Sequence, residues 1–290
     1  MTDADASNAA PTESPALWWS TYATPLHHVH HWHIGALRSW VLREENEWRI
    51  AWEAERDPLD TAHHHEGPVA RDAARFAWDT LPNGYTMHRY SMQQTTSDVT
   101  LHPVLADRAL IVRPEHAISI VPGASITLFV STPLWVRVSA DGGTRALVEM
   151  PTVRLSDTWF GASTRTGELC YAARTIGRLK LDAVPQRMHR AITPVHIRNQ
   201  ARDTLLLERV QVPAPHLALY QTDTATLWTQ ALTLEREADR ATTDPAGAVH
   251  IRSGPPPEAA RATRLTAPRE PTRRNLFVST FSAMGALFGS

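Results

Sequence analysis

Residues 125–138 read SITLFVSTPLWVRV, and the pattern of this segment decides the fold class. Ile126, Leu128 and Val130 are apolar residues at every second position, as expected of a strand with one buried face. Pro133 lacks a backbone N–H and interrupts the run, because proline is tolerated at strand ends rather than inside a sheet. The segment therefore predicts two consecutive strands, at 125–130 and 134–138.

Segments of the same kind extend in both directions, with turn sequences such as 121–123 and 141–143 between them. Many short strands without intervening helices favour an all-β fold, an antiparallel β-sandwich of about a dozen strands. The further predicted strands are 99–101, 109–112, 118–121, 146–150, 168–172, 178–181, 194–198, 205–212, 217–220 and 226–235.

The region before residue 98 predicts two other elements. Trp48, Ile50 and Trp52 alternate with polar residues after a polar turn at 44–46, which indicates an N-terminal tryptophan-rich hairpin packed on the sandwich. Residues 66–80 carry apolar side chains at helical spacing and predict a helix.

The ends of the chain differ in composition from its middle. Residues 1–16 predict a disordered leader, and 239–274, rich in proline and arginine, predict a flexible tether. We expect residues 17–238 to form the folded unit, with 17–97 and 98–238 as its alternative subregions.

Residues 275–290 predict a short amphipathic helix. Phe277, Phe281, Met284 and Phe288 share one helical face. Such a helix contacts a protein partner or a membrane surface, or folds back on its own sandwich.

Bulk properties exclude several classes of protein. The 290 residues are 42% hydrophobic, which excludes disorder of the whole chain, and a formal charge of −1 leads us to expect no nucleic-acid partner. Cys170, the only cysteine, excludes an intrachain disulfide and is expected to be buried as a small apolar residue. The first twenty residues lack a secretory pattern, so we expect a cytoplasmic protein, or one peripheral to the inner membrane face.

Two histidine clusters form a candidate metal site. Residues 27–33 read HHVHHWH, and on a strand His31 and His33 point to the same side. These two imidazoles are candidate ligands for zinc or iron, with His27 or His28 approaching from the preceding loop and the cluster at 63–65 adding a ligand if the fold brings it near. The alternative is an exposed edge strand that carries histidines without binding a cofactor.

A second candidate site lies where acidic, aromatic and glycine residues are densest. Asp157 and Glu168 are a candidate carboxylate pair, and the neighbouring aromatic side chains are a candidate binding platform. The predicted binding residues are Asp157, Trp159, Phe160, Glu168 and Tyr171.

The sequence lacks the P-loop, GxGxxG, GxSxG, HExxH and EF-hand patterns. We therefore expect a non-catalytic β-sandwich binding or assembly module without a cofactor, whose C-terminal helix contacts the partner. The alternatives are a metal-dependent hydrolase or oxygenase that uses the cluster at 27–33, and an acid/base enzyme that acts on carbohydrate through Asp157 and Glu168.

Four segments together resemble a prokaryotic family known only as a domain of unknown function. These segments are residues 128–136, 156–161, 167–171 and 194–199. The resemblance covers roughly residues 17–238 and implies a shared all-β fold. It implies no activity and no catalytic residues.

Overall fold

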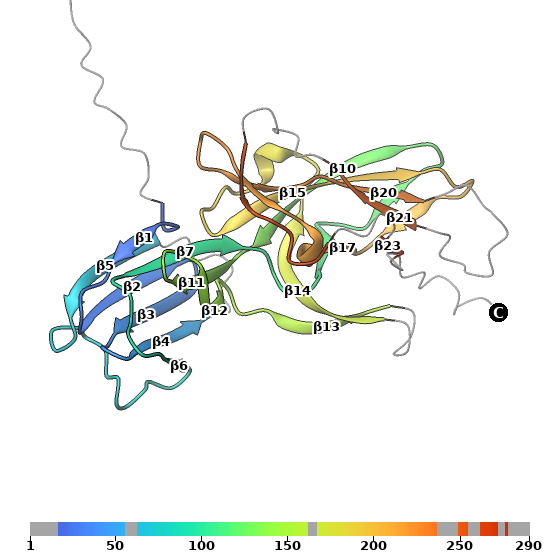
Figure 1. The fold of residues 1–290 in the computed structure, drawn as a ribbon. Helices are drawn as coiled ribbons and strands as arrows, with labels where there is room; N and C mark the ends of the chain where they lie inside the picture. Colours follow the sequence, from blue (N-terminus) through green and yellow to red (C-terminus); the bar gives the residue numbers. More distant parts are fainter. Residues whose placement is uncertain are drawn as a thin grey trace, which may run out of the picture.

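The computed structural model describes residues 17–55, 63–161, 167–236, 249–254, 262–271 and 276–277. Within these residues the chain forms the strands β1 to β23, the short 3-10 helices η1 (Leu181–Ala183) and η2 (Ala214–His216), and no α-helix. The strands make five sheets, and most neighbouring strands are antiparallel (Figure 1). The prediction of an all-β, mostly antiparallel fold is confirmed.

Sheet 1 is built from the N-terminal strands in the order β5-β2-β3-β4-β6. It contains the tryptophan-rich hairpin predicted from the sequence, which is extended by two strands on one side and by one strand on the other. Its strands are β2 (His28–Ile34), β3 (Leu37–Arg43), β4 (Glu47–Ala54), β5 (His63–Ala70) and β6 (Thr86–Ser91).

Sheet 2 packs against sheet 1 and completes the N-terminal half of the molecule. Its order is β1-β7-β11-β12, with β1 (Thr21–Ala23), β7 (Asp98–Val104), β11 (Trp135–Ala140) and β12 (Arg145–Pro151). Alternation along each strand turns one set of side chains inward, so Trp32 and Trp48 of sheet 1 share a buried core with Leu101 and Val136 of sheet 2.

The C-terminal half contains three sheets. Sheet 3 joins β10 (Ser125–Pro133), β15 (Arg190–Asn199), β18 (Leu219–Gln221), β19 (Leu227–Thr229), β20 (Leu232–Arg236), β21 (Val249–Ser253), β22 (Thr263–Thr266) and β23 (Leu276–Phe277). Sheet 4 joins β13 (Ser156–Phe160), β14 (Glu168–Gly177), β8 (Leu110–Pro114) and β17 (Val210–Val212), and sheet 5 joins β9 (Ile118–Ile120) and β16 (Leu205–Leu207).

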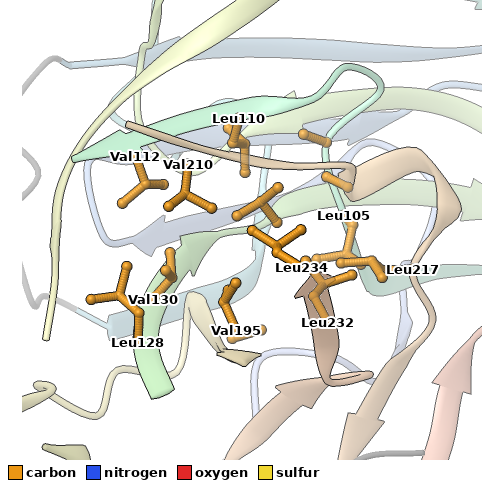
Figure 2. Packing of buried hydrophobic residues seen from close by; sticks show 14 of the residues in the cluster. Leu105, Leu110, Val112, Leu128, Val130, Val195, Val210, Leu217, Leu232 and Leu234 are labelled. Atoms are coloured by element: carbon orange, nitrogen blue, oxygen red, sulfur yellow. The ribbon is translucent and has the colours of Figure 1, made fainter. Parts of the chain in front are cut away.

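A second core lies inside the C-terminal half. Figure 2 shows Leu110 of β8, Leu128 of β10, Val195 of β15 and Leu234 of β20 meeting in this core. All four side chains are fully buried. The two cores are separate clusters, and Trp19 packs against both.

The segment at 125–138 passes from one half to the other. Residues 125–133 pair along their whole length with β15 in sheet 3, and residues 135–140 pair with β7 and β12 in sheet 2. The predicted break at Pro133 is therefore confirmed. Because β1–β7 and β11–β12 belong to the N-terminal half, the chain crosses between the halves three times, after β7, β10 and β12 (Figure 1).

The predicted helix at 66–80 is wrong. Residues 63–70 form β5, which pairs with β2, and turns follow at 71–75. Without β5 the backbone groups on this side of β2 would be left unpaired, and a strand supplies their partners where a helix could not. Of the apolar side chains that make up the helical pattern, Phe76 packs against a small core that contains Val29 and Trp78.

The C-terminal predictions need two corrections. The expected tether contains β21 and β22, because the edges of β20 and β18 are paired by these strands and Leu265 packs against the second core. A C-terminal helix is not shown: Leu276 and Phe277 form β23 beside β21. Phe281, Met284, Phe288 and the leader at 1–16 lie outside the described residues.

Candidate functional site

The fold brings the two histidine clusters together. Strands β2 and β5 pair antiparallel, so that His33 lies opposite His64 and His31 lies opposite Glu66. The interpretation of β2 as an edge strand is wrong, because β2 lies between β5 and β3. Alternation along β2 then divides the histidines between the inner and the outer face of sheet 1.

On the inner face, two histidines are part of the packing. The rings of His30 and His65 are stacked with centroids 5.2 Å apart, and His30 Nδ1 lies 3.0 Å from His65 Nε2. His30 Nε2 lies 3.2 Å from the carbonyl oxygen of Ala23, which can only accept, so Nε2 donates and Nδ1 accepts from His65. Burial lowers the pKa of His30 to about 4 and also lowers the pKa of His65, so both rings are neutral at pH 7.

On the outer face, His31 lines a cavity of about 590 Å³, the outer cavity. The cavity lies between β2, β3, β5 and the turns that follow β5, and its lining is Val29, His31, Trp40, Glu66, Val69, Ala73, Ala74 and Arg75. Trp40 stacks on His31 with centroids 4.3 Å apart and on Phe76 with centroids 4.5 Å apart. The outer cavity therefore has a wall of parallel aromatic rings.

The polar groups of the outer cavity are incompletely paired. Glu66 Oε2 lies 3.9 Å from His31 Nδ1, beyond hydrogen-bond distance, and the Glu66 side chain is 63% exposed. His31 Nε2 is buried without a hydrogen-bond partner. Burial lowers the pKa of His31, an effect that the nearby Glu66 opposes. In the part of the chain that the structure describes, no ion pair joins Arg75 to a carboxylate.

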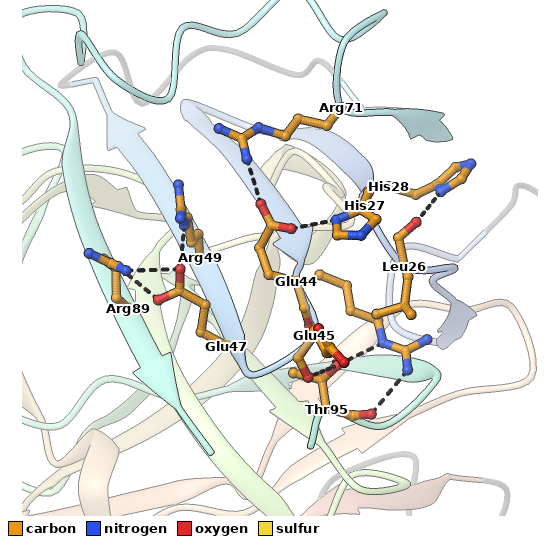
Figure 3. A network of polar contacts seen from close by, with 11 residues as sticks. Leu26, His27, His28, Glu44, Glu45, Glu47, Arg49, Arg71, Arg89 and Thr95 are labelled. Atoms are coloured by element: carbon orange, nitrogen blue, oxygen red, sulfur yellow. Dashed lines mark hydrogen bonds and ion pairs between the residues drawn. The ribbon is translucent and has the colours of Figure 1, made fainter. Parts of the chain in front are cut away.

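The predicted metal ligands share a face of sheet 1 but do not form a metal site. His31 and His33 lie on the outer face, as the sequence predicts, and His64 lies there too, but no three His, Cys, Asp or Glu side chains among the described residues are placed to hold a metal ion. His27 and His28 have other partners: His27 Nδ1 lies 2.6 Å from Glu44 Oε2, and His28 bonds the carbonyl oxygen of Leu26 (Figure 3).

The second predicted site is divided by the hairpin of β13 and β14. Asp157 lies opposite Tyr171 and Phe160 lies opposite Glu168, three positions further along the ladder. Because side chains alternate between faces, Asp157 and Glu168 project from opposite sides of the hairpin and cannot act as one carboxylate pair. Trp159, 42% exposed, lies on the face of Asp157, so the hairpin does not bring the five predicted binding residues to one face.

The partners of these residues are structural. Asp157 forms an ion pair with Arg108, and the Tyr171 hydroxyl donates to Asp107. Glu168 accepts a hydrogen bond from Gln211. Cys170 is buried as predicted, and burial, aided by Glu168, raises the pKa of its thiol to about 12.

The sequence contained only part of the signal for the outer cavity. His31 was singled out, but Trp40, Glu66 and Arg75 were not. The signal for Trp40 is its position next to Val41: because adjacent side chains on a strand face opposite sides and Val41 is in the core, Trp40 lies on the outer face. Glu66 and Arg75 were hidden because the pattern at 66–80 was interpreted as helical.

One family model matches the chain, over residues 18–285, and its description is "Protein of unknown function (DUF432)". The chain belongs to this family. Membership in DUF432 confirms the resemblance seen in the sequence and extends it beyond residue 238. No curated protein and no solved structure matches the chain. None of its described residues belongs to a helix with the length and apolar character that crossing a bilayer requires.

Proposed function

We propose that this DUF432 protein is a non-catalytic binding module that holds a small organic molecule in the outer cavity. The observation that carries the proposal is a cavity of about 590 Å³ that is lined by the stacked rings of His31 and Trp40, by apolar side chains and by two charged side chains. Ligand sites have volumes of this order, are mostly apolar, and contain a few polar groups that fix orientation.

Binding rather than catalysis is proposed because the polar groups are not arranged for proton transfer. A catalytic base and the group that orients it are usually within hydrogen-bond reach. His31 and Glu66 are 3.9 Å apart. The depressed pKa of His31 leaves its ring neutral at pH 7, as suits a stacking surface.

A cavity-filling variant tests the proposal. Ala73 lines the outer cavity, and an indole placed there occupies the space of a ligand, whereas Ala117 lies on the exposed surface elsewhere. We expect a library of small metabolites, screened by thermal shift, to contain a compound that stabilises the wild type and Ala117→Trp but not Ala73→Trp. A screen without stabilising compounds, or stabilisation retained in Ala73→Trp, would contradict the proposal.

A second candidate function is metal-dependent chemistry at β2 and β5. It is favoured by the register, which places His64 opposite His33 and Glu66 opposite His31, so that side-chain rotation could gather four ligands. Elemental analysis of untagged protein purified without metal-affinity resin tests it. One zinc or iron per chain that is lost in a His31→Ala/His33→Ala variant would support this candidate, and metal-free protein would end it.

The proposed partner contact rests on the sequence pattern of residues 275–290. Deletion of residues 278–290 should leave the fold intact and remove an interaction with a protein or a membrane surface.

A cytoplasmic location and the absence of a nucleic-acid partner stay predictions. We further propose that each half is a β-sandwich, a description supported for the N-terminal half by the core that sheets 1 and 2 share.

A further inference from the structure

We propose that the ligand of the outer cavity is a zwitterion of the amino-acid class, with an ammonium group bound by Glu66 and a carboxylate bound by Arg75. This inference rests on the proposed function, and it names the chemistry of the ligand. The observation behind it is that two side chains of opposite charge line one cavity without pairing with each other.

Among the described residues, Glu66 forms no ion pair with an arginine or a lysine, and its one ion-pair neighbour is His31, whose Nδ1 lies 3.9 Å from Glu66 Oε2. Arg38 on β3 and Arg71 after β5 have other partners: Arg38 lies 3.4 Å from Glu55, and Arg71 lies 2.7 Å from Glu44. His31, directly opposite on β2, is neutral at pH 7 because burial lowers its pKa. An ammonium group in the cavity would therefore find an uncompensated carboxylate.

Arg75 supplies the complementary charge from the turns that follow β5. Arg75 is one of the lining residues of the cavity and forms no ion pair with any carboxylate that the structure describes. A guanidinium binds a carboxylate through two parallel hydrogen bonds, and such charge-assisted pairs are stronger than neutral ones. The carboxylate of the ligand would take this position.

Most of the remaining lining residues are apolar. They include Val29, Val69 and Ala74, together with the indole of Trp40. This surface fits a hydrocarbon or planar side chain, not a further charge. A purely anionic ligand would bring its charge into the cavity that Glu66 shares, and a purely cationic one would meet Arg75 there, so a molecule carrying both charges fits best.

The test uses the full chain and a panel of the standard amino acids, with affinity measured by calorimetry. The best-binding amino acid is then compared with two derivatives: its amide, which lacks the carboxylate, and its N-acetyl form, which lacks the ammonium group. Glu66→Gln should weaken binding of the amino acid and its amide about tenfold and should not weaken binding of the N-acetyl form. Arg75→Gln should weaken binding of the amino acid and the N-acetyl form by a similar factor and should not weaken binding of the amide.

Glu45→Gln and Arg202→Gln serve as matched controls, because both side chains are exposed and neither lines the cavity. Unchanged thermal unfolding of the Glu66 and Arg75 variants shows that they fold. If no amino acid of the panel binds, or if neither substitution changes the affinity, the proposal of a zwitterionic ligand is overturned. If a neutral or singly charged compound from the metabolite screen still binds and is blocked by Ala73→Trp, the cavity is a ligand site and only its ligand class is wrong.

Discussion

Single buried polar residues determine how the N-terminal half responds to pH. His30 is 1% exposed and lies between Tyr22, Trp32 and His65, so a proton on its ring would be a buried charge. In the unfolded chain the same ring titrates at its ordinary pKa of 6.5. The folded and unfolded states therefore bind different numbers of protons between pH 6.5 and about 4.

The first prediction follows from this difference. The unfolded state binds the extra proton, so the free energy of unfolding should fall as the pH decreases from 6.5 to about 4, with His30 contributing about 2 kcal/mol of the loss. Urea titrations at several pH values measure it. His30→Phe should show a shallower decline than the wild type, and His116→Phe, at an exposed site, should match the wild type. Equal slopes in all three proteins would count against the assignment.

Glu47 illustrates the opposite case, a buried carboxylate held in its charged form. Its side chain accepts hydrogen bonds from Arg89 on β6 and from Arg49 on β4 (Figure 3). The bonds from Arg89 are the largest cause of its lowered pKa, and Arg49 adds to them. The carboxylate thus links the two strands at one edge of sheet 1.

We expect Glu47→Gln to lower the free energy of unfolding at pH 7 by about 1 kcal/mol, because a neutral amide bonds the two guanidinium groups less strongly. Since the folded pKa is depressed, the contribution of Glu47 is complete above its ordinary pKa of 4.5 and is lost as the pH falls through the folded pKa. The difference from wild type should therefore shrink in acid. Glu45→Gln, nearby but exposed, is the control, and a deficit that persists at pH 3 would refute the ion-pair explanation.

At the scale of elements, sheet 1 and sheet 2 are stable only as a pair. Each contributes one apolar face to a core that no single sheet could bury. Leu101 on β7 lies at this interface and is 1% exposed, whereas Leu206 on β16 is 50% exposed. Replacing both leucines by alanine removes the same atoms at a buried and at an exposed position, so the difference in the free energy of unfolding reports the packing of the core.

Leu101→Ala should reduce the free energy of unfolding by about 3 kcal/mol, through lost burial and the cavity left behind. Leu206→Ala should change it by less than about 1 kcal/mol. Urea denaturation followed by tryptophan fluorescence reports both. Similar losses at the two positions would mean that sheets 1 and 2 are not packed as described.

Strands were predictable from the sequence because alternation is a local signal. The end of a strand at Pro133 and the inward-facing side chains of Trp48 and Ile50 can both be predicted from neighbouring residues alone. The error at 66–80 arose because strand β5 is specified by its partner β2, more than thirty positions earlier in the chain. The candidate site was only partly predictable for the same reason: Arg75 meets His31 and Glu66 only after β5 has paired.

At the scale of the whole molecule, the two halves are joined by the path of the chain. Three crossings connect them, and the first described residues add side-chain links: Trp18 Nε1 donates to the carbonyl oxygen of Met188, and Trp19 Nε1 donates to Gln221. The sequence allows a boundary between residues 97 and 98. A boundary there would divide the core that sheets 1 and 2 share, because the apolar face of β7, β11 and β12 is buried against sheet 1.

A fragment of residues 98–290 should therefore fail to fold as a compact unit. The apolar face of sheet 2, including Val99, Val136 and Met150, would be exposed to water, and aggregation is the expected result. Near-ultraviolet circular dichroism and gel filtration measure this, with residues 17–290 as the control. A monomeric fragment with an intact tertiary spectrum would show that residues 98–290 are an independent domain.

The alternating path of the chain also sets an order for its biosynthesis. Sheet 1 emerges first from the ribosome, but the strands that cover it end only at Pro151, after β8, β9 and β10 have been made. About half of the polypeptide must be translated before the first core can close, and the tryptophan-rich face of sheet 1 stays uncovered until then. During this period the exposed apolar face can associate with other chains, and slower translation before residue 151 would prolong the exposure.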